Sequence, residues 1–164
     1  AARWSALWKA FEHLVDHRMP PLHVDRVQIA QLLLNLASNA CDAMAGLPER
    51  KLFIGVVPAI DGDQVLVVND TGPGMPRSVQ ARVFEPFFST KDEGKGTGLG
   101  LSIVKRIAQD HHAELDLTST PGSGTAFRVR FPGRARALSR PEIRAVESRT
   151  PTPAPALRAT GARD

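Results

Sequence analysis

The sequence has few of the residues that indicate an extracellular or membrane protein. Its 164 residues include one cysteine, Cys41, and no tyrosine. A single thiol excludes an internal disulfide framework and a zinc site built from several cysteines. No apolar run approaches the roughly 20 residues that span a bilayer, and the first ten residues lack the apolar core of a secretory signal. We therefore expect a cytoplasmic chain without a membrane span. The missing initiator Met is expected of a fragment or a processed product.

Charge is unevenly distributed along an otherwise ordinary globular composition, with 42% hydrophobic and 23% charged residues. Residues 1–132 carry 14 basic and 14 acidic side chains, whereas 133–164 carry 7 arginines against 3 acidic residues. The excess charge thus lies outside the expected folded part, which argues against nucleic acid as a partner. The tail 133–164 is rich in Pro, Ala and Arg, so we predict a disordered segment. It serves either as a solvated linker or as a weak contact for an acidic surface.

Hydrophobic periodicity predicts alternating helices and strands. The expected elements are a helix over 4–15, a helix over 25–45, strands over 52–60 and 65–68, a functional loop over 70–96, a helix over 99–111, and strands over 114–118 and 125–131. Asp25 is the expected N-cap of the second helix, with Gln28 placed to complete a capping box. This order predicts an α/β two-layer sandwich with the helices on one face of the sheet.

The second helix carries polar side chains on one face. Asn35, Asn39 and Asp42 lie at i, i+4 and i+7. A carboxamide oxygen is a suitable ligand for Mg²⁺, which takes few protein ligands together with phosphate oxygens. The alternative is that both asparagines only bond to neighbouring backbone groups.

A turn rich in glycine follows the strand over 65–68. Asp70 emerges at the strand end, where its carboxylate can accept a hydrogen bond from an exocyclic amine such as that of adenine. Gly72 and Gly74 allow the backbone to turn tightly beside a flat base. An ordinary Asp/Gly turn is the alternative.

The run Phe84-Glu-Pro-Phe87-Phe88-Ser-Thr-Lys91 resembles the anchor of a mobile flap. Three phenylalanines would hold the flap, and Lys91 supplies a point charge suited to a phosphate. A surface loop fixed by core aromatics is the alternative. The polar residues that follow are typical of a lid.

The glycine-rich segment 96–101 opens the next helix and offers its free N–H groups and partial positive charge to an anion. It is not a Walker A motif, because no Gly-Lys pair precedes Ser or Thr. It does not match the dinucleotide fingerprint either, since no strand runs into it.

Together these four motifs resemble the N, G1, F and G2 boxes of the catalytic ATP-binding domain of two-component sensor histidine kinases. The resemblance covers about 22–132, in the same order. It implies the Bergerat fold, a mixed, mostly antiparallel sheet with helices on one face, shared with gyrase B and MutL. It also implies ATP and Mg²⁺ as cofactors. The residues that it places at the nucleotide are Asn35, Asn39, Asp42, Asp70, Gly72, Gly74, Lys91, Gly96, Thr97, Gly98, Leu99, Gly100 and Leu101.

The resemblance also implies roles for these residues. Asn39, assisted by Asn35, would coordinate Mg²⁺, Asp70 would bind the adenine amine, and Lys91 on a lid over about 71–96 would reach the terminal phosphates. In related ATPases a glutamate activates water at the position of Asn35, which cannot act as a general base. This difference favours transfer to a protein acceptor over hydrolysis.

Two features depart from the family. No acceptor histidine lies in a suitable helical hairpin, so the implied partners are a dimerisation and phosphoacceptor domain outside this chain and a downstream response regulator. Residues 1–21 lack the strand that usually opens the domain and read instead as an atypical helical segment. His111 and His112 are predicted to be surface residues.

The competing functions are a stand-alone serine kinase of the anti-sigma type and an ATP-gated interaction module.

Overall fold

The computed structural model describes residues 11–15, 19–59, 62–91 and 96–133, with the backbone alone for 11–15. The elements are β1 (Phe11–Val15), α2 (Arg26–Ala43), β2 (Leu52–Pro58), β3 (Gln64–Asp70), α3 (Arg77–Gln80), α4 (Gly100–Asp110), β4 (Glu114–Ser119) and β5 (Thr125–Phe131). The predicted disordered tail lies almost wholly outside these residues. No described helix is long and apolar enough to cross a membrane.

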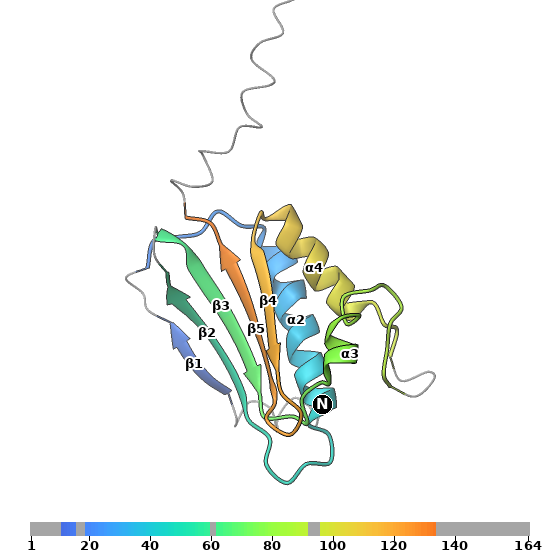
Figure 1. Ribbon diagram of the computed structural model, residues 1–164. Coiled ribbons are helices and arrows are strands. Elements are labelled where there is room, and N and C mark those ends of the chain that lie inside the picture. Colours follow the sequence, from blue (N-terminus) through green and yellow to red (C-terminus); the bar gives the residue numbers. More distant parts are fainter. Residues whose placement is uncertain (1–10, 16–18, 60–61, 92–95, 134–164) are drawn as a thin grey trace, which may run out of the picture.

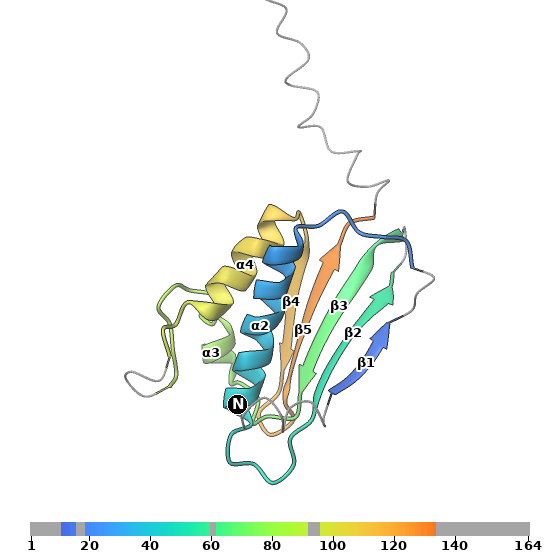
Figure 2. The same ribbon diagram turned by 180° about the vertical axis from the view of Figure 1, so that it is seen from behind.

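The strands form one mixed sheet in the order β1-β2-β3-β5-β4. Only β1 and β2 are parallel; the other three pairings are antiparallel. Helices α2 and α4 cover one face of this sheet, as Figures 1 and 2 show from opposite sides. The predicted two-layer α/β sandwich is therefore confirmed.

One row of paired residues crosses the whole sheet. Phe11 pairs with Leu52, Leu52 with Asp70, Asp70 with Thr125, and Thr125 with Ser119. The row lies where β3 ends and β5 begins. It therefore aligns residues that are far apart in sequence at one end of the sheet.

The first strand corrects two predictions. Phe11–Val15 is a strand, not part of a helix, and it supplies the opening strand that 1–21 were expected to lack. The apolar spacing of this segment fits a helix, but pairing with the exposed edge of β2 satisfies its backbone groups, and tertiary context overrides a local periodicity. The remainder of the predicted helix, 4–10, lies outside the described residues.

Helix α2 begins as predicted but is capped differently. The Asp25 carboxylate accepts hydrogen bonds from the N–H groups of Val27 (2.8 Å) and Gln28 (3.3 Å). The Asp25 N–H, which a capping box would pair with Gln28, donates instead to Nε2 of His111 (3.0 Å). Nδ1 of His111 lies 2.8 Å from the carbonyl of Ile107. His111 is half-buried, and it joins the end of α4 to the start of α2, a structural role that the prediction of a surface histidine did not include.

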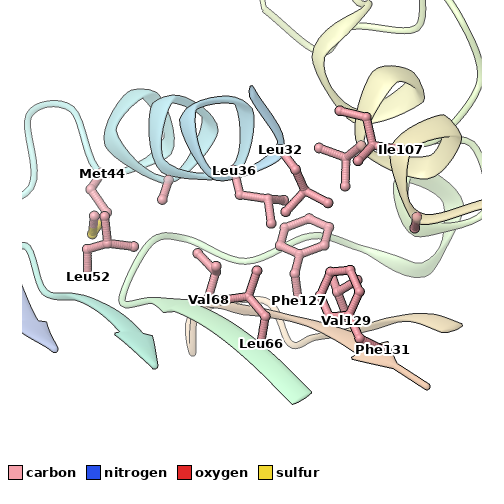
Figure 3. Close-up of a cluster of buried hydrophobic side chains, with 13 residues drawn as sticks. Leu32, Leu36, Met44, Leu52, Leu66, Val68, Ile107, Phe127, Val129 and Phe131 are labelled. Atoms are coloured by element: carbon pink, nitrogen blue, oxygen red, sulfur yellow. The ribbon is translucent and has the colours of Figure 1, made fainter. Parts of the chain in front are cut away.

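The core fills the space between the two helices and the sheet. Leu32 and Leu36 of α2 project from the helix toward Phe127 and Val129 of β5 (Figure 3). Full burial of each such side chain stabilises the fold by roughly 1.5–3 kcal/mol. This packing fixes the position of α2 relative to the strand ends. It thereby also fixes the polar residues of the same helix, Asn35, Asn39 and Asp42.

Candidate active site

A cleft of about 670 Å³ lies between α2, the loop after β3, the loop before α4 and the start of β5. Eleven of the thirteen predicted site residues line it: Asn35, Asn39, Asp42, Asp70, Gly74, Lys91, Gly96, Thr97, Gly98, Gly100 and Leu101. Gly72 and Leu99 are not among the lining residues. The four motifs, spread over 67 positions of sequence from 35 to 101, therefore meet at one cavity.

Asp70 lies at the end of β3 and is only 6% exposed. Burial raises the pKa of this carboxyl, and hydrogen bonds from the backbone N–H groups of Gly72 and Thr125 oppose that rise. The Gly72 N–H lies 2.8 Å from Oδ1. The carboxyl is thus held in a fixed orientation at the cleft wall, where it can accept a hydrogen bond from a ligand N–H group.

The glycines after β3 are required by close packing. A Cβ at Gly72 would lie 2.8 Å from Oδ1 of Asp70. Gly72 does not line the cleft itself, but its lack of a side chain leaves room for the Asp70 carboxylate that does. Gly74 has φ +68°, and a Cβ there would lie 2.0 Å from the carbonyl oxygen of Thr120. The Gly122 N–H donates to the carbonyl of Pro73 (2.7 Å). The loop after β3 is therefore clamped against the hairpin that joins β4 to β5.

Apolar side chains complete this end of the cleft, and the sequence analysis did not identify them as site residues. They are Met75, Val79, Val83 and Phe127. The Phe84 ring packs edge-on to Phe127 at a centroid distance of 6.4 Å. The i, i+4 spacing of Val79 and Val83 was the available signal, since it gives one apolar face to the turn around α3. This wall suits a flat apolar ring.

The polar face of α2 forms the opposite wall. Asn35 and Asn39 both face Gly100 of α4: a Cβ on that glycine would lie 3.6 Å from Oδ1 of Asn35 and from Nδ2 of Asn39. Among the described residues, the buried Nδ2 of Asn35 has no hydrogen-bond partner. An unpaired buried amide is costly, and the alternative of purely structural asparagines leaves this cost unexplained.

Lys91 forms an ion pair with Asp42 of α2. Its Nζ lies 2.8 Å from Oδ2 of Asp42, and the two side chains are 34% and 24% exposed. The ammonium is therefore already held at the cleft by a partly solvated ion pair. A partly exposed ion pair contributes little to stability. The Lys91 ammonium can therefore leave Asp42 and pair with an anionic ligand at a small cost in free energy.

The loop that leads into α4 packs closely against the backbone of Phe87. Gly98 has φ +66°, and a Cβ there would come within 2.4 Å of the backbone of Phe87. The Phe87 side chain is 77% exposed, whereas Phe84 and Phe88 are half-buried, so only two of the three predicted aromatic anchors are packed inward. Leu99 is the N-cap of α4. The first-turn N–H groups of α4 have no intrahelical partners and lie at the cleft.

Residues 24–135 match the family described as histidine kinase-, DNA gyrase B- and HSP90-like ATPases. The chain belongs to this ATPase family. It is 40% identical over 120 residues to the C4-dicarboxylate transport sensor protein DctS of Rhodobacter capsulatus, covering 73% of this chain and 18% of DctS. Its fold is similar to that of the mycobacterial sensor histidine kinase MprB, with a TM-score of 0.66 and 27% identity over 81% of this chain and 92% of that structure.

A further match is full-length ShkA in complex with AMPPNP, with a TM-score of 0.67 and 26% identity, covering 80% of this chain and 28% of ShkA. The chain spans only 15% to 19% of the length of the first curated relatives that it matches. The shared part is thus the ATP-binding catalytic domain of the histidine-kinase branch of this ATPase family.

The donor set of the cleft fits a hard cation held with phosphates. Among the described residues, no cluster of three or more His, Cys, Asp or Glu side chains is arranged to hold a metal ion alone. Amide oxygens of Asn35 and Asn39 are suitable for a cation that keeps most of its water and takes phosphate oxygens. This ATPase-family cleft therefore fits a magnesium–phosphate group better than a free metal ion.

Proposed function

We propose that this domain binds MgATP and donates the γ-phosphoryl group to a histidine on a dimerisation domain outside this chain, as part of two-component signal transduction. The observation that carries the proposal is the convergence of the α2 asparagines, Asp70 and the start of α4 on one cleft. The similarity to sensor kinases supports the same assignment. The proposed domain covers 22–132, with a lid over about 71–96.

The cleft divides the proposed roles between its two ends. At the buried end, Asp70 accepts a hydrogen bond from the adenine amine, and Gly72 and Gly74 keep that edge accessible. At the other end, Asn39 coordinates Mg²⁺ with Asn35 assisting, and Lys91 binds the terminal phosphates. The backbone of 96–101 surrounds the phosphates with N–H donors.

Phosphoryl transfer needs positioning and charge neutralisation more than acid–base groups. An acceptor histidine nitrogen attacks the γ-phosphorus as the bond to the β,γ-bridging oxygen breaks, and ADP leaves with the electron pair. Bound Mg²⁺ would neutralise phosphate charge. Asn35 occupies the position at which related ATPases place a glutamate that activates water, and its amide cannot act as a general base. This supports transfer over hydrolysis.

The first test is calorimetric titration of the 164-residue chain with ATP, in Mg²⁺ and then in EDTA. We expect binding that is much stronger in Mg²⁺. Asn39→Ala should lose most of the Mg²⁺-dependent increment and leave the affinity in EDTA nearly unchanged. Equal losses in both conditions would contradict the metal role, and no binding by the wild-type chain would refute the proposal.

The second test supplies an acceptor. Incubating the chain with γ-labelled ATP and the phosphoacceptor domain of a related sensor kinase should give an acid-labile, base-stable phosphate on that domain. Acid-stable phosphate would instead support the serine-kinase alternative. Retained ATP binding without any transfer would support an ATP-gated interaction module. A response regulator and a cytoplasmic location complete the proposal.

A further inference from the structure

Ser119, the last residue of β4, lies just outside the cleft and makes three hydrogen bonds through one hydroxyl group. Its Oγ accepts from the Met75 N–H (2.8 Å), donates to the Gly124 carbonyl (3.0 Å) and lies 3.0 Å from Oγ1 of Thr125. Thr125 lines the cleft and is 8% exposed. Ser119 therefore connects the loop after β3 to a polar side chain that faces the ligand space.

The directions of these bonds follow from their partners. A serine hydroxyl has one hydrogen and two acceptor lone pairs. The Met75 N–H can only donate and occupies one lone pair, while the Gly124 carbonyl can only accept and takes the hydrogen. One lone pair remains on Ser119, so the Thr125 hydroxyl must donate to it. The Thr125 hydrogen is thereby directed away from the cleft, and only its lone pairs are left for a ligand.

Thr125 and Asp70 pair directly across the sheet, in the same row that contains Ser119. Both side chains line the cleft. Two acceptors at one position favour an amine with two hydrogens over a carbonyl, because a carbonyl oxygen would face lone pairs. This arrangement discriminates between a 6-amino purine and a 6-oxo purine.

We propose that Ser119 is a specificity-determining positioning residue, which fixes the Thr125 hydroxyl as an acceptor and so selects adenine over guanine nucleotides. The inference rests on the proposed nucleotide function and adds a residue that does not touch the ligand. Gln80 supports the arrangement, since its Nε2 donates to the carbonyls of Met75 (2.7 Å) and Ser119 (2.9 Å). This second clamp keeps Ser119 and the loop in register when the hydroxyl is removed.

The test compares ATP and GTP affinities of the full chain by calorimetry in Mg²⁺. Ser119→Ala frees the Thr125 hydroxyl to rotate and donate into the cleft, so the ratio of ATP to GTP affinity should fall about tenfold, in keeping with one hydrogen bond changing direction. Ser119→Thr keeps a hydroxyl and should retain the wild-type ratio. Ser123→Ala, an exposed serine of the same hairpin, is the matched control and should also retain it.

A double-mutant cycle separates this role from a general loosening of the hairpin. Thr125→Val should lower the ATP to GTP ratio by itself, and adding Ser119→Ala to it should not lower the ratio further. If Ser119 only holds the hairpin in place, Ser119→Ala should reduce the ATP and GTP affinities equally and leave their ratio unchanged. That result would overturn the inference. An unchanged ratio in Thr125→Val would overturn it as well, and this holds even if Ser119→Ala fails to fold.

The wild-type chain separates the two proposals. If it binds neither nucleotide, the proposed function fails. If it binds ATP and GTP equally well, MgATP binding survives but the role of Ser119 is wrong.

Discussion

The two ends of the cleft are built in different ways. At the proposed base end, Asp70 and Gly72 are buried and hydrogen-bonded to each other, and Gly74 packs against the β4–β5 hairpin at distances that exclude a side chain. At the phosphate end, a partly exposed ion pair and a helix start provide charge and N–H groups. In the proposed function, the base end would therefore select the shape and the hydrogen-bond donors of the base, whereas the phosphate end would supply positive charge.

The largest expected effect is a loss of stability at the base end, where Gly124 packs against the backbone of Asp70. A Cβ on Gly124 would lie 2.0 Å from the Asp70 carbonyl oxygen, and φ is +86°. Gly124→Ala should lower the free energy of unfolding by about 3 kcal/mol or more. In Gly122→Ala φ is similar, +80°, but nothing lies within 4 Å, so the loss should be about 1 kcal/mol. Urea denaturation of the two variants measures the difference; equal losses would mean that the hairpin is not clamped.

The next effect concerns ligand affinity at the same end. Asp70→Asn replaces an acceptor oxygen by a donor and should weaken ATP binding by about 1–3 kcal/mol, roughly 5- to 150-fold. Asp116→Asn, an exposed change in β4, is the control. Calorimetry with ATP checks both. An unaltered affinity in Asp70→Asn would mean that the base lies elsewhere.

A smaller effect is expected at the phosphate end. Lys91→Ala should lower ATP affinity about tenfold without changing adenosine affinity, because the lost charge interacts only with phosphates. It should reduce stability by less than about 1 kcal/mol, as for other partly exposed ion pairs. Lys105→Ala, on the exposed part of α4, controls for net charge. If adenosine binding also weakens, the two ends of the cleft are not independent.

The smallest effect is a pH dependence of stability. Burial raises the pKa of Asp70 in the folded state, so the folded protein takes up a proton at a higher pH than the unfolded chain. The stability of the wild type relative to Asp70→Asn should therefore increase as pH falls through that raised pKa, and level off below the ordinary aspartate value. ATP affinity should fall over the same range. Urea denaturation of both proteins from pH 7 to pH 4 checks the sign.

Local patterns predicted most of this architecture. The alternation in 125–131 matches β5 and the amphipathic period of 99–111 matches α4 within a residue at each end, because both signals depend on near neighbours. The first strand could not be predicted in this way, since its pairing with β2 is a tertiary contact. The cap formed by His111 on Asp25 joins positions 86 apart and leaves no local trace.

The site was predicted by the order of its motifs more than by any one of them. Asn35, Asp70 and the run from Phe84 to Lys91 each had an ordinary structural alternative, and the agreement of the motifs outweighed those alternatives. Ser119 and Thr125 were not predicted as site residues, because the roles proposed for them depend on strand register. A serine and a threonine flanking a glycine turn carry no signal until β4 and β5 are paired.

The parallel pairing of β1 has a consequence for any force that reaches the domain along its chain. Phe11 begins β1 and stands in the row that continues through Leu52 to Asp70 and Thr125. A force on the residues before Phe11 therefore acts on the end of the sheet that carries Asp70 and Thr125, the residues proposed to bind the base. A displacement of Phe11 would therefore be transmitted through Leu52 to the strand ends that carry Asp70 and Thr125.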